Sequence, residues 1–211
     1  MSCDPFAERL ASPTPTPGGG AAAARAGLHA SALLRMVAGI TLLKLKQDES
    51  SEAAVALSAA LKKAEELGAI FESLEEEDIA AFEAYLKALR LPRSTPAEIE
   101  MRRLACQSAA ALATDVPLAM LEASMEILFL AKKLLDLSRT TPLKAESDLG
   151  GAVELASASF RMAELNIRVN LPQVSPEKGS QVRSRWKDLA AGMRRLSSDL
   201  REAVLAKLSG E

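Results

Sequence analysis

The stretch from Thr16 to Lys46 decides the fold and reads TPGGGAAAARAGLHASALLRMVAGITLLKLK. Alanine and leucine dominate it, and both residues favour the helical conformation. Three glycines stand directly before the alanines, so the stretch predicts a long helix from Ala21 to about Lys46. Small side chains recur every four residues along one strip of this helix, which lets another helix approach closely. We therefore expect this helix to lie at the centre of the protein.

The composition of the whole chain supports an all-α fold. Of the 211 residues, 48% are hydrophobic but only 3% are aromatic. Strands favour β-branched and aromatic residues, whereas alanine and leucine favour helices. A chain of this length can bury one sizeable core. The sequence thus predicts an all-α, single-domain bundle of long helices over residues 1–211, in which residues 1–17 form a short helix and a proline-rich lead-in.

Helix-start and helix-stop signals divide the rest of the chain. Thr95 and Glu98 have the spacing of a capping box, and Ser147 can cap the next-to-last helix. Pro117 removes a backbone hydrogen bond to the carbonyl of Ala113, so we expect an interruption there. The expected helices, besides the central one, cover residues 5–11, 52–73, 75–91, 96–137, 147–170 and 176–209. In this division the acidic residues 75–77 form the solvated first turn of a helix.

Several classes of function receive no support from the sequence. The net charge of −2 offers no basic surface for nucleic acid. Two distant cysteines and one histidine make neither a disulfide framework nor a metal site, so we expect no metal and no resident cofactor. The N-terminus lacks the pattern of a signal peptide, and the apolar segments carry charges, so we expect no membrane span and a cytoplasmic protein.

The glycine run, residues 18–20, is the best candidate for a ligand site. Successive glycines at a helix start allow the backbone to approach a ligand closely, with free N–H groups directed at it. It is not a phosphate-binding P-loop, because no Gly-Lys-Ser/Thr follows and no strand precedes it. A flexible tether between the first short helix and the bundle would need the same residues. The run alone leaves both interpretations open.

Polar residues near other helix ends are the next candidates. Ser147 and Asp148 stand at a helix start, where they can either serve a reaction or simply cap and favour the helix dipole. The dipole alone cannot make Asp148 a general base; burial would have to raise the pKa of its carboxyl group. Asn166 lies near the end of the same predicted helix, and Asp78 shares a helix face with two aromatic residues.

Taken together, these features form an ordered set of landmarks along nearly the whole chain. They are PTPGGG at residues 15–20, MVA at 36–38, DIAAFEAY at 78–85, LRLPR at 89–93, ATDVPL at 113–118, SDLG at 147–150 and LNIRVNL at 165–171. In order and spacing the set resembles the cyclodeaminase/methenyltetrahydrofolate cyclohydrolase family. The resemblance implies a helical, dimeric, metal-free protein that acts on one-carbon derivatives of tetrahydrofolate. Its expected partners are therefore a folate substrate and a second copy of the chain.

The resemblance also implies a reaction and roles for the candidates. The reaction is hydrolysis of 5,10-methenyltetrahydrofolate to 10-formyltetrahydrofolate, or the related cyclodeamination of a formimino derivative. Asp148 is the expected base. The expected substrate contacts are Thr16, Pro17, Gly18, Gly19 and Gly20, then Lys44 and Lys46 for the glutamate tail, and Asp78, Ser147 and Asn166. These roles require the glycine run and Asp148 to meet in one pocket.

Two other classes of function remain open. One is a catalytically inactive paralogue that binds a folate-like heterocycle, and the other is a structural helical dimer in which the glycine run is only a tether. The lysine-containing end of the central helix departs from the usual family pattern, and this departure keeps both alternatives in view.

Overall fold

The computed structural model describes residues 4–45 and 51–209, and every regular element in these ranges is a helix. The α-helices are α1 (Pro5–Leu10), α2 (Gly19–Leu45), α3 (Glu52–Leu89), α4 (Pro96–Leu137), α5 (Glu146–Asn170) and α6 (Pro176–Ser209). A short 3-10 helix, η1 (Leu171–Gln173), separates the last two. The all-α prediction is confirmed.

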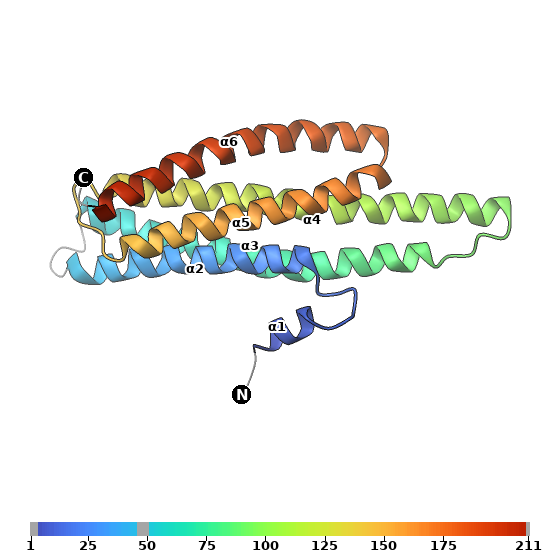
Figure 1. The fold of residues 1–211 in the computed structure, drawn as a ribbon, viewed down its shortest axis with the longest axis horizontal. Helices are drawn as coiled ribbons and strands as arrows, with labels where there is room; N and C mark the ends of the chain where they lie inside the picture. Colours follow the sequence, from blue (N-terminus) through green and yellow to red (C-terminus); the bar gives the residue numbers. More distant parts are fainter. Residues whose placement is uncertain (1–3, 46–50, 210–211) are drawn as a thin grey trace.

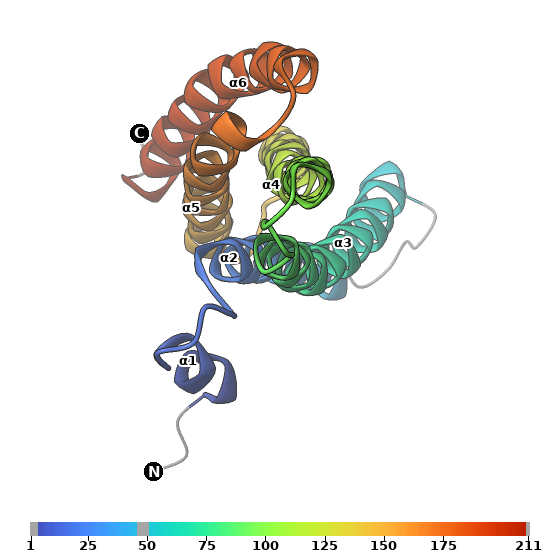
Figure 2. The ribbon, with the colours of Figure 1, turned by 90° about the vertical axis from the view of Figure 1, so that its right-hand side faces the viewer.

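The long helices form one elongated bundle. In Figures 1 and 2, α2 lies between α3 and α5, α4 lies on their inner side, and α6 covers the face farthest from α2. The hairpin of α3 and α4 extends well past the start of α2. The N-terminus of α2 therefore lies beside the middle of α3 rather than at the end of the bundle. This offset brings residues from the body of α3 to the glycine run.

The small strip on α2 serves close packing, as the sequence predicts. Gly27 is buried, and a Cβ atom placed there would overlap the ring of Phe71 on α3. The core is otherwise built from alanine and aliphatic side chains, with Phe71 and Phe160 among its largest fully buried members. Because glycine and alanine leave little bulk between α2 and α3, the two helix axes can lie near the close end of the usual range.

Two helices meet the composition of a membrane span. By length and hydropathy alone, α2 and α4 are apolar enough to cross a bilayer, although the sequence predicts no span. Both helices contribute many buried residues to the core of the bundle. Core helices of soluble proteins pass the same test, so this indication is weak.

The predicted break in the second long helix is wrong. The structure has one continuous helix, α3, where the sequence suggests helices over 52–73 and 75–91. Ser73 does not cap a new helix, because its hydroxyl donates a hydrogen bond to Glu77 within the same helix. Leu74 and Glu75 are both buried. The acidic residues 75–77 therefore lie within the length of α3 and do not form a solvated first turn. No proline or glycine stands there to stop the helix.

The start of α5 also differs from the prediction. The helix begins at Glu146, and its N-cap position is Ala145, which has a left-handed backbone and makes no side-chain cap. Ser147 therefore lies inside the first turn and is not the capping residue. The loop before α5 is held to α2 by a 3.2 Å hydrogen bond from the backbone N–H of Lys144 to the hydroxyl of Thr41.

The capping box predicted at the start of the next helix is confirmed, since Thr95 and Glu98 form it completely at the start of α4. The interruption predicted at Pro117 is wrong, because α4 continues through this proline from Pro96 to Leu137. The carbonyl of Ala113, which Pro117 cannot serve, accepts a hydrogen bond from the side-chain amide of Asn170. A side chain at the end of α5 thus supplies the hydrogen bond that Pro117 removes from α4.

This hydrogen bond leads to a prediction for stability. Asn170→Ala should lower the free energy of unfolding by about 1 kcal/mol, because the part-buried Ala113 carbonyl loses its donor. In a Pro117→Ala background the backbone N–H of residue 117 can serve this carbonyl, so Asn170→Ala should then cost less. Urea unfolding of the four proteins measures the coupling. An equal cost in both backgrounds would contradict this role of Asn170.

Candidate functional site

The glycine run and Asp78 lie together in the structure. Gly20 is buried, and a Cβ atom at this position would overlap the carboxylate of Asp78 on α3. The same carboxylate accepts a hydrogen bond from the backbone N–H of Ala21. A side chain from the middle of α3 thus caps the first turn of α2, where Gly18 has no side chain to do so.

Asp78 has the electrostatic character that a general base requires. Burial raises the pKa of its carboxyl group above the ordinary aspartate value, and this effect outweighs the Ala21 N–H bond, which lowers the pKa. A raised pKa makes the ionised carboxylate a stronger proton acceptor. The sequence predicts Asp148 as the base, whereas the carboxyl group with this character in the structure belongs to Asp78.

The glycine run leaves room for a ligand beside Asp78. Pro17 and Gly20 are buried and Thr16 and Gly18 are half-buried, whereas Gly19 is exposed. A Cβ atom at Gly19 would meet no atom within 4 Å. The first N–H groups of a helix have no acceptor within the helix, so those of Gly19 and Gly20 can bind a polar ligand group.

A cleft of about 650 Å³ begins at Thr16 and Pro17, directly before the glycine run, although neither the three glycines nor Asp78 line it. Its walls come from α1, from the lead-in with Thr16 and Pro17, and from Ile79 and Glu83 of α3. Ile79 follows Asp78 directly on α3. The cleft therefore provides space for an organic ligand of moderate size at the edge of the glycine run.

Asn166, on α5, lies at about the same height along the bundle as the glycine run at the start of α2. Helices α2 and α5 are antiparallel: Lys144 bonds Thr41, and Leu33 would contact a Cβ atom placed on Gly151. The same register sets Asn166 near the level of Gly18. Within the described part of the chain, its side-chain amide nitrogen is buried and has no hydrogen-bond partner. Such a group is available to a ligand.

The expected pocket shared by the glycine run and Asp148 does not form within one chain. Because α5 runs antiparallel to α2, its first turn lies beside the C-terminal half of α2. Asp148 and the exposed Ser147 are therefore about 24 Å from Gly20, measured along α2 at 1.5 Å per residue. The sequence could place both features at helix starts, but it could not show that the starts lie at different levels.

The predicted lysines are also distant from the glycine run. Lys44 is exposed in the last turn of α2, about 36 Å from Gly20 along the same helix. Lys46 lies outside the described residues. Within one chain, neither Asp148, the expected base, nor Lys44, an expected contact of the glutamate tail, lies near the glycine run.

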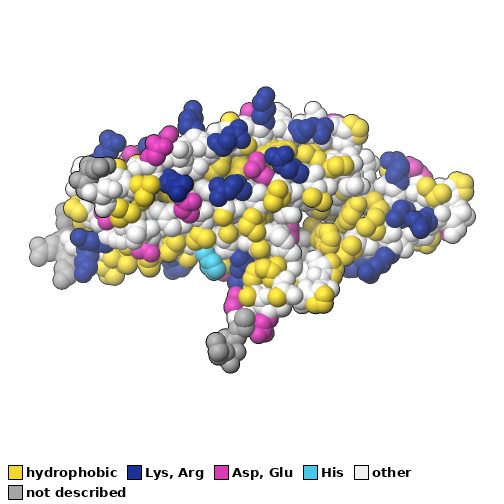
Figure 3. All heavy atoms as spheres, in the orientation of Figure 1, with side chains coloured by type: hydrophobic (Ala, Val, Ile, Leu, Met, Phe, Trp, Pro, Cys, Tyr) yellow, Lys and Arg dark blue, Asp and Glu magenta, His cyan; other side chains and the backbone are white. Residues whose placement is uncertain are grey.

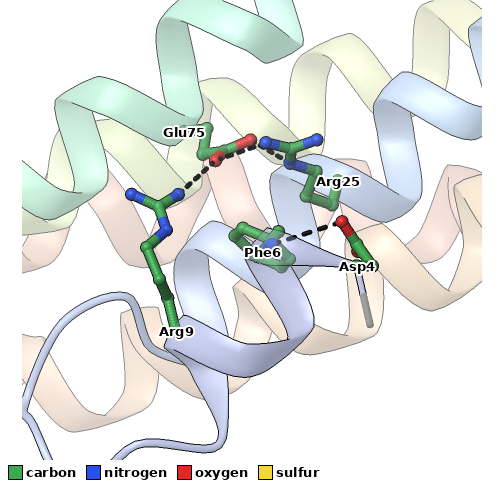
Figure 4. Close-up of polar contacts among 5 residues, drawn as sticks. All are labelled: Asp4, Phe6, Arg9, Arg25 and Glu75. Carbon is green, nitrogen blue, oxygen red and sulfur yellow. Dashed lines mark hydrogen bonds and ion pairs between the residues drawn. The ribbon is translucent and has the colours of Figure 1, made fainter. Parts of the chain in front are cut away.

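A cluster that the sequence did not predict holds α1 beside the site (Figure 4). Glu75 is only 8% exposed and pairs with Arg25, whose Nε lies 2.5 Å from Oε2 and whose Nη2 lies 3.1 Å from Oε1. Arg9 of α1 reaches Glu75 at 3.9 Å. The guanidinium of Arg25 stacks over the ring of Phe6 at 4.5 Å from its centroid. An arginine in a strip of small residues was the only sign of this contact in the sequence.

Comparisons with known proteins agree with the fold and with the family that the sequence resembles. The family model described as Formiminotransferase-cyclodeaminase matches residues 2–187. A methenyltetrahydrofolate cyclohydrolase from Methylorubrum extorquens is 38% identical over 165 residues, which cover 78% of this chain and 76% of that protein. A formimidoyltransferase-cyclodeaminase from Sus scrofa is 31% identical over 185 residues, covering 87% of this chain but 33% of that protein. The chain thus spans about three quarters of the first relative and one third of the second.

A solved structure supports the fold along the whole length. The crystal structure of formiminotetrahydrofolate cyclodeaminase from Thermotoga maritima matches with a TM-score of 0.82 and 23% sequence identity. The match covers 99% of this chain and 98% of that one.

Proposed function

Since the chain belongs to the formiminotransferase-cyclodeaminase family, we propose that it hydrolyses 5,10-methenyltetrahydrofolate to 10-formyltetrahydrofolate at the N-terminus of α2. Cyclodeamination of a formimino derivative is the closely related reaction at the same carbon. The observation that carries the proposal is the partly buried Asp78 carboxylate, which lies against the glycine run with a raised pKa. The cleft lined by Thr16, Pro17 and Ile79 offers space for the substrate near this carboxylate.

The chemistry requires little from the protein beyond an oriented water and a base. The methenyl carbon lies in a cationic amidinium group and is already electrophilic. A water oxygen bonds to this carbon while the Asp78 carboxylate accepts the proton. The bond from the carbon to N5 then breaks while the hydroxyl oxygen of the adduct loses its proton and becomes the formyl oxygen. N5 takes one proton, the formyl group remains on N10, and one proton in total is released to solvent. Asp78 rather than Asp148 is the base in this proposal, because only Asp78 lies at the glycine run of the same chain.

The remaining polar groups bind the substrate. The N–H groups of Gly19 and Gly20 hold an acceptor atom of the substrate at the start of α2. The unpartnered amide nitrogen of Asn166 donates a hydrogen bond from α5. Thr16 and Pro17 form the wall of the cleft where the lead-in meets α2.

The proposal also covers the location, the oligomeric state and the cofactor requirement of the enzyme. We propose a soluble, cytoplasmic homodimer that needs no resident cofactor, with a folate derivative as its substrate. The name of the relative from Methylorubrum extorquens, a methenyltetrahydrofolate cyclohydrolase, supports a folate substrate. Sedimentation of the purified chain measures the oligomeric state directly.

One assay tests the reaction. Purified protein should accelerate the loss of the near-ultraviolet absorbance of methenyltetrahydrofolate over buffer alone, at a pH where spontaneous hydrolysis is slow. Release of ammonia from formiminotetrahydrofolate distinguishes the deaminase reaction. Tight binding in calorimetry without loss of absorbance would instead assign the chain to the inactive, folate-binding alternative. Neither binding nor turnover with any of these folates would contradict the proposed function.

A further inference from the structure

Helix α1 lies outside the bundle and projects from it near the start of α2 (Figures 1 and 3). It is six residues long, and Phe6 is its one buried residue. A helix this short is not stable alone in water. The position of α1 therefore depends on the few contacts that it makes with the bundle.

The N-terminal segment, residues 4–16, is joined to the bundle by few polar contacts. Its hydrogen bonds, such as the one between the hydroxyls of Ser12 and Thr14, join residues of the segment itself. Within the described part of the chain, the pair between Arg9 and Glu75 is the one hydrogen bond or ion pair that the segment makes with α2–α6. Little else holds the segment in place besides the burial of Phe6.

Arg25 of α2 connects Phe6 of α1 to Glu75 of α3 (Figure 4). Its guanidinium lies 4.5 Å from the centroid of the Phe6 ring, and its Nε lies 2.5 Å from Oε2 of Glu75. A cation over an aromatic ring is attracted by the electrons of the ring. The buried carboxylate in turn requires cations beside it, because an unpaired charge in the interior is costly. We call this set of four residues, Phe6, Arg9, Arg25 and Glu75, the α1 dock.

The α1 dock holds one wall of the cleft in place. Pro5, Glu8 and Arg9 of α1 form this wall, whereas Ile79 and Glu83 of α3 belong to the body of the bundle. If α1 leaves the bundle, the cleft loses this wall and opens to solvent. The cleft therefore has its full depth only while α1 is docked.

The proposed base does not depend on α1. Asp78 and Gly20 meet through the packing of α3 against α2, and neither residue lines the cleft. The α1 dock lies nearby, because Arg25 follows Gly20 and Glu75 precedes Asp78 within about 8 Å along either helix. Loss of α1 should thus change ligand binding and leave the reacting groups in place.

From this geometry we infer that α1 is a detachable wall of the cleft, and that Phe6, Arg25 and Glu75 are positioning residues that dock it. A ligand in the cleft touches α1 only while the helix is docked. Ligand binding and docking must therefore favour each other by the same factor. This coupling to a folate rests on the proposed function, whereas the docking of α1 does not.

Hydrogen exchange followed by mass spectrometry tests the docking without any substrate. In the wild type, the amides of α1 should exchange faster than those in the middle of α2, because α1 can detach alone. Phe6→Ala should speed the exchange of α1 by about tenfold or more and leave α2–α6 unchanged. Leu10→Ala is the matched control, because Leu10 is 38% exposed on the same helix and lies outside the α1 dock.

Two results would overturn this part of the inference. Exchange of α1 as slow as that of the middle of α2 in the wild type would show that the helix does not detach. Equal exchange of α1 in the wild type and in Phe6→Ala would show that the ring does not dock it.

Glu75→Gln tests the charged part of the α1 dock. Glutamine has nearly the same shape as glutamate, but it removes the charge that holds Arg9 and Arg25. The substitution should speed the exchange of α1, and Glu76→Gln, at an exposed neighbouring position, should not. Equal exchange in these two variants would show that Glu75 is not a positioning residue.

Kinetics test the coupling to the substrate. Phe6→Ala should raise KM about tenfold with little change in kcat, because it removes a wall of the cleft but no reacting group. Leu10→Ala should change neither constant. An unchanged KM in Phe6→Ala, or a loss confined to kcat, would overturn the role of α1 in binding.

A bound folate should also act on α1. Saturating 10-formyltetrahydrofolate, the product of the proposed reaction, should slow the exchange of α1 in the wild type, and exchange unaffected by bound folate would overturn the coupling. A wild-type protein that neither binds nor converts folates contradicts the proposed function. The exchange of the substrate-free proteins then still decides whether α1 is docked by Phe6, Arg25 and Glu75.

Discussion

Asp78→Asn should lower kcat by a factor of about 10² to 10⁴ while the protein stays folded, if the carboxylate accepts the proton of the attacking water. Asparagine is nearly the same size as aspartate and its side-chain oxygen can still accept the hydrogen bond from the Ala21 N–H. The substitution therefore keeps the cap on α2 and removes the base. The measurement is the loss of methenyltetrahydrofolate absorbance under saturating substrate, together with circular dichroism of the variant.

Glu76→Gln is the matched control for this substitution. Glu76 is exposed on the same helix, and two residues before Asp78 it lies on nearly the opposite face of that helix. It loses one carboxylate without touching the site, so its kcat should equal that of the wild type. Wild-type kcat in a folded Asp78→Asn protein would show that the carboxylate only caps α2.

The raised pKa of Asp78 gives the same experiment a pH dependence. The base works when it is ionised, so wild-type kcat should fall as the pH drops through the pKa of Asp78, and the Asp78→Asn profile should lose this step. The free energy of unfolding should depend on pH in the opposite direction. A carboxyl group whose pKa is raised in the folded state stabilises the fold when it is protonated, and this contribution is lost as the pH rises through that pKa. At neutral pH, Asp78→Asn should be at least as stable as the wild type in urea.

The fold followed from the sequence because its signals are local. Alanine and leucine content predicts helices wherever they occur, and the capping box at Thr95 and the proline at Pro96 mark one start unambiguously. The false break before Glu75 arose from a local signal as well, since three acidic residues are typical of a first turn. Tertiary contacts decided otherwise: Arg25 and Arg9 neutralise Glu75, so a buried carboxylate is tolerated in the middle of α3.

The sequence predicted individual residues of the site but not how they are arranged. The sequence identified the glycine run, Asp78 and Asn166, and the structure brings these to one level of the bundle. It could not rank Asp78 above Asp148, because that choice depends on the register between helices. The register is set by packing, through glycines such as Gly27 under Phe71, and no short-range pattern encodes it. The offset start of α2 beside the middle of α3 is therefore what selects Asp78.

Gly20→Ala should abolish most of the activity without unfolding the protein. The added Cβ atom would occupy the place of the Asp78 carboxylate, so the aspartate must rotate away and give up its bond to the Ala21 N–H. The loss in kcat should approach that of Asp78→Asn. Stability should change less, since alanine favours the helix by up to about 1 kcal/mol over glycine and partly offsets the lost cap.

Two other glycines on α2 separate this effect from helix propensity. Gly39→Ala adds the same atom where the nearest neighbour, Leu61, lies at an ordinary 3.6 Å, so it should stabilise the helix and leave kcat unchanged. Gly19→Ala adds it to open space at the glycine run, so it should keep kcat but raise KM by crowding the ligand. A loss of kcat confined to Gly20→Ala indicates displacement of Asp78, because only at this position does the new methyl group meet the carboxylate. Equal activity in all three would mean that the glycine run is a tether and that the reaction occurs elsewhere.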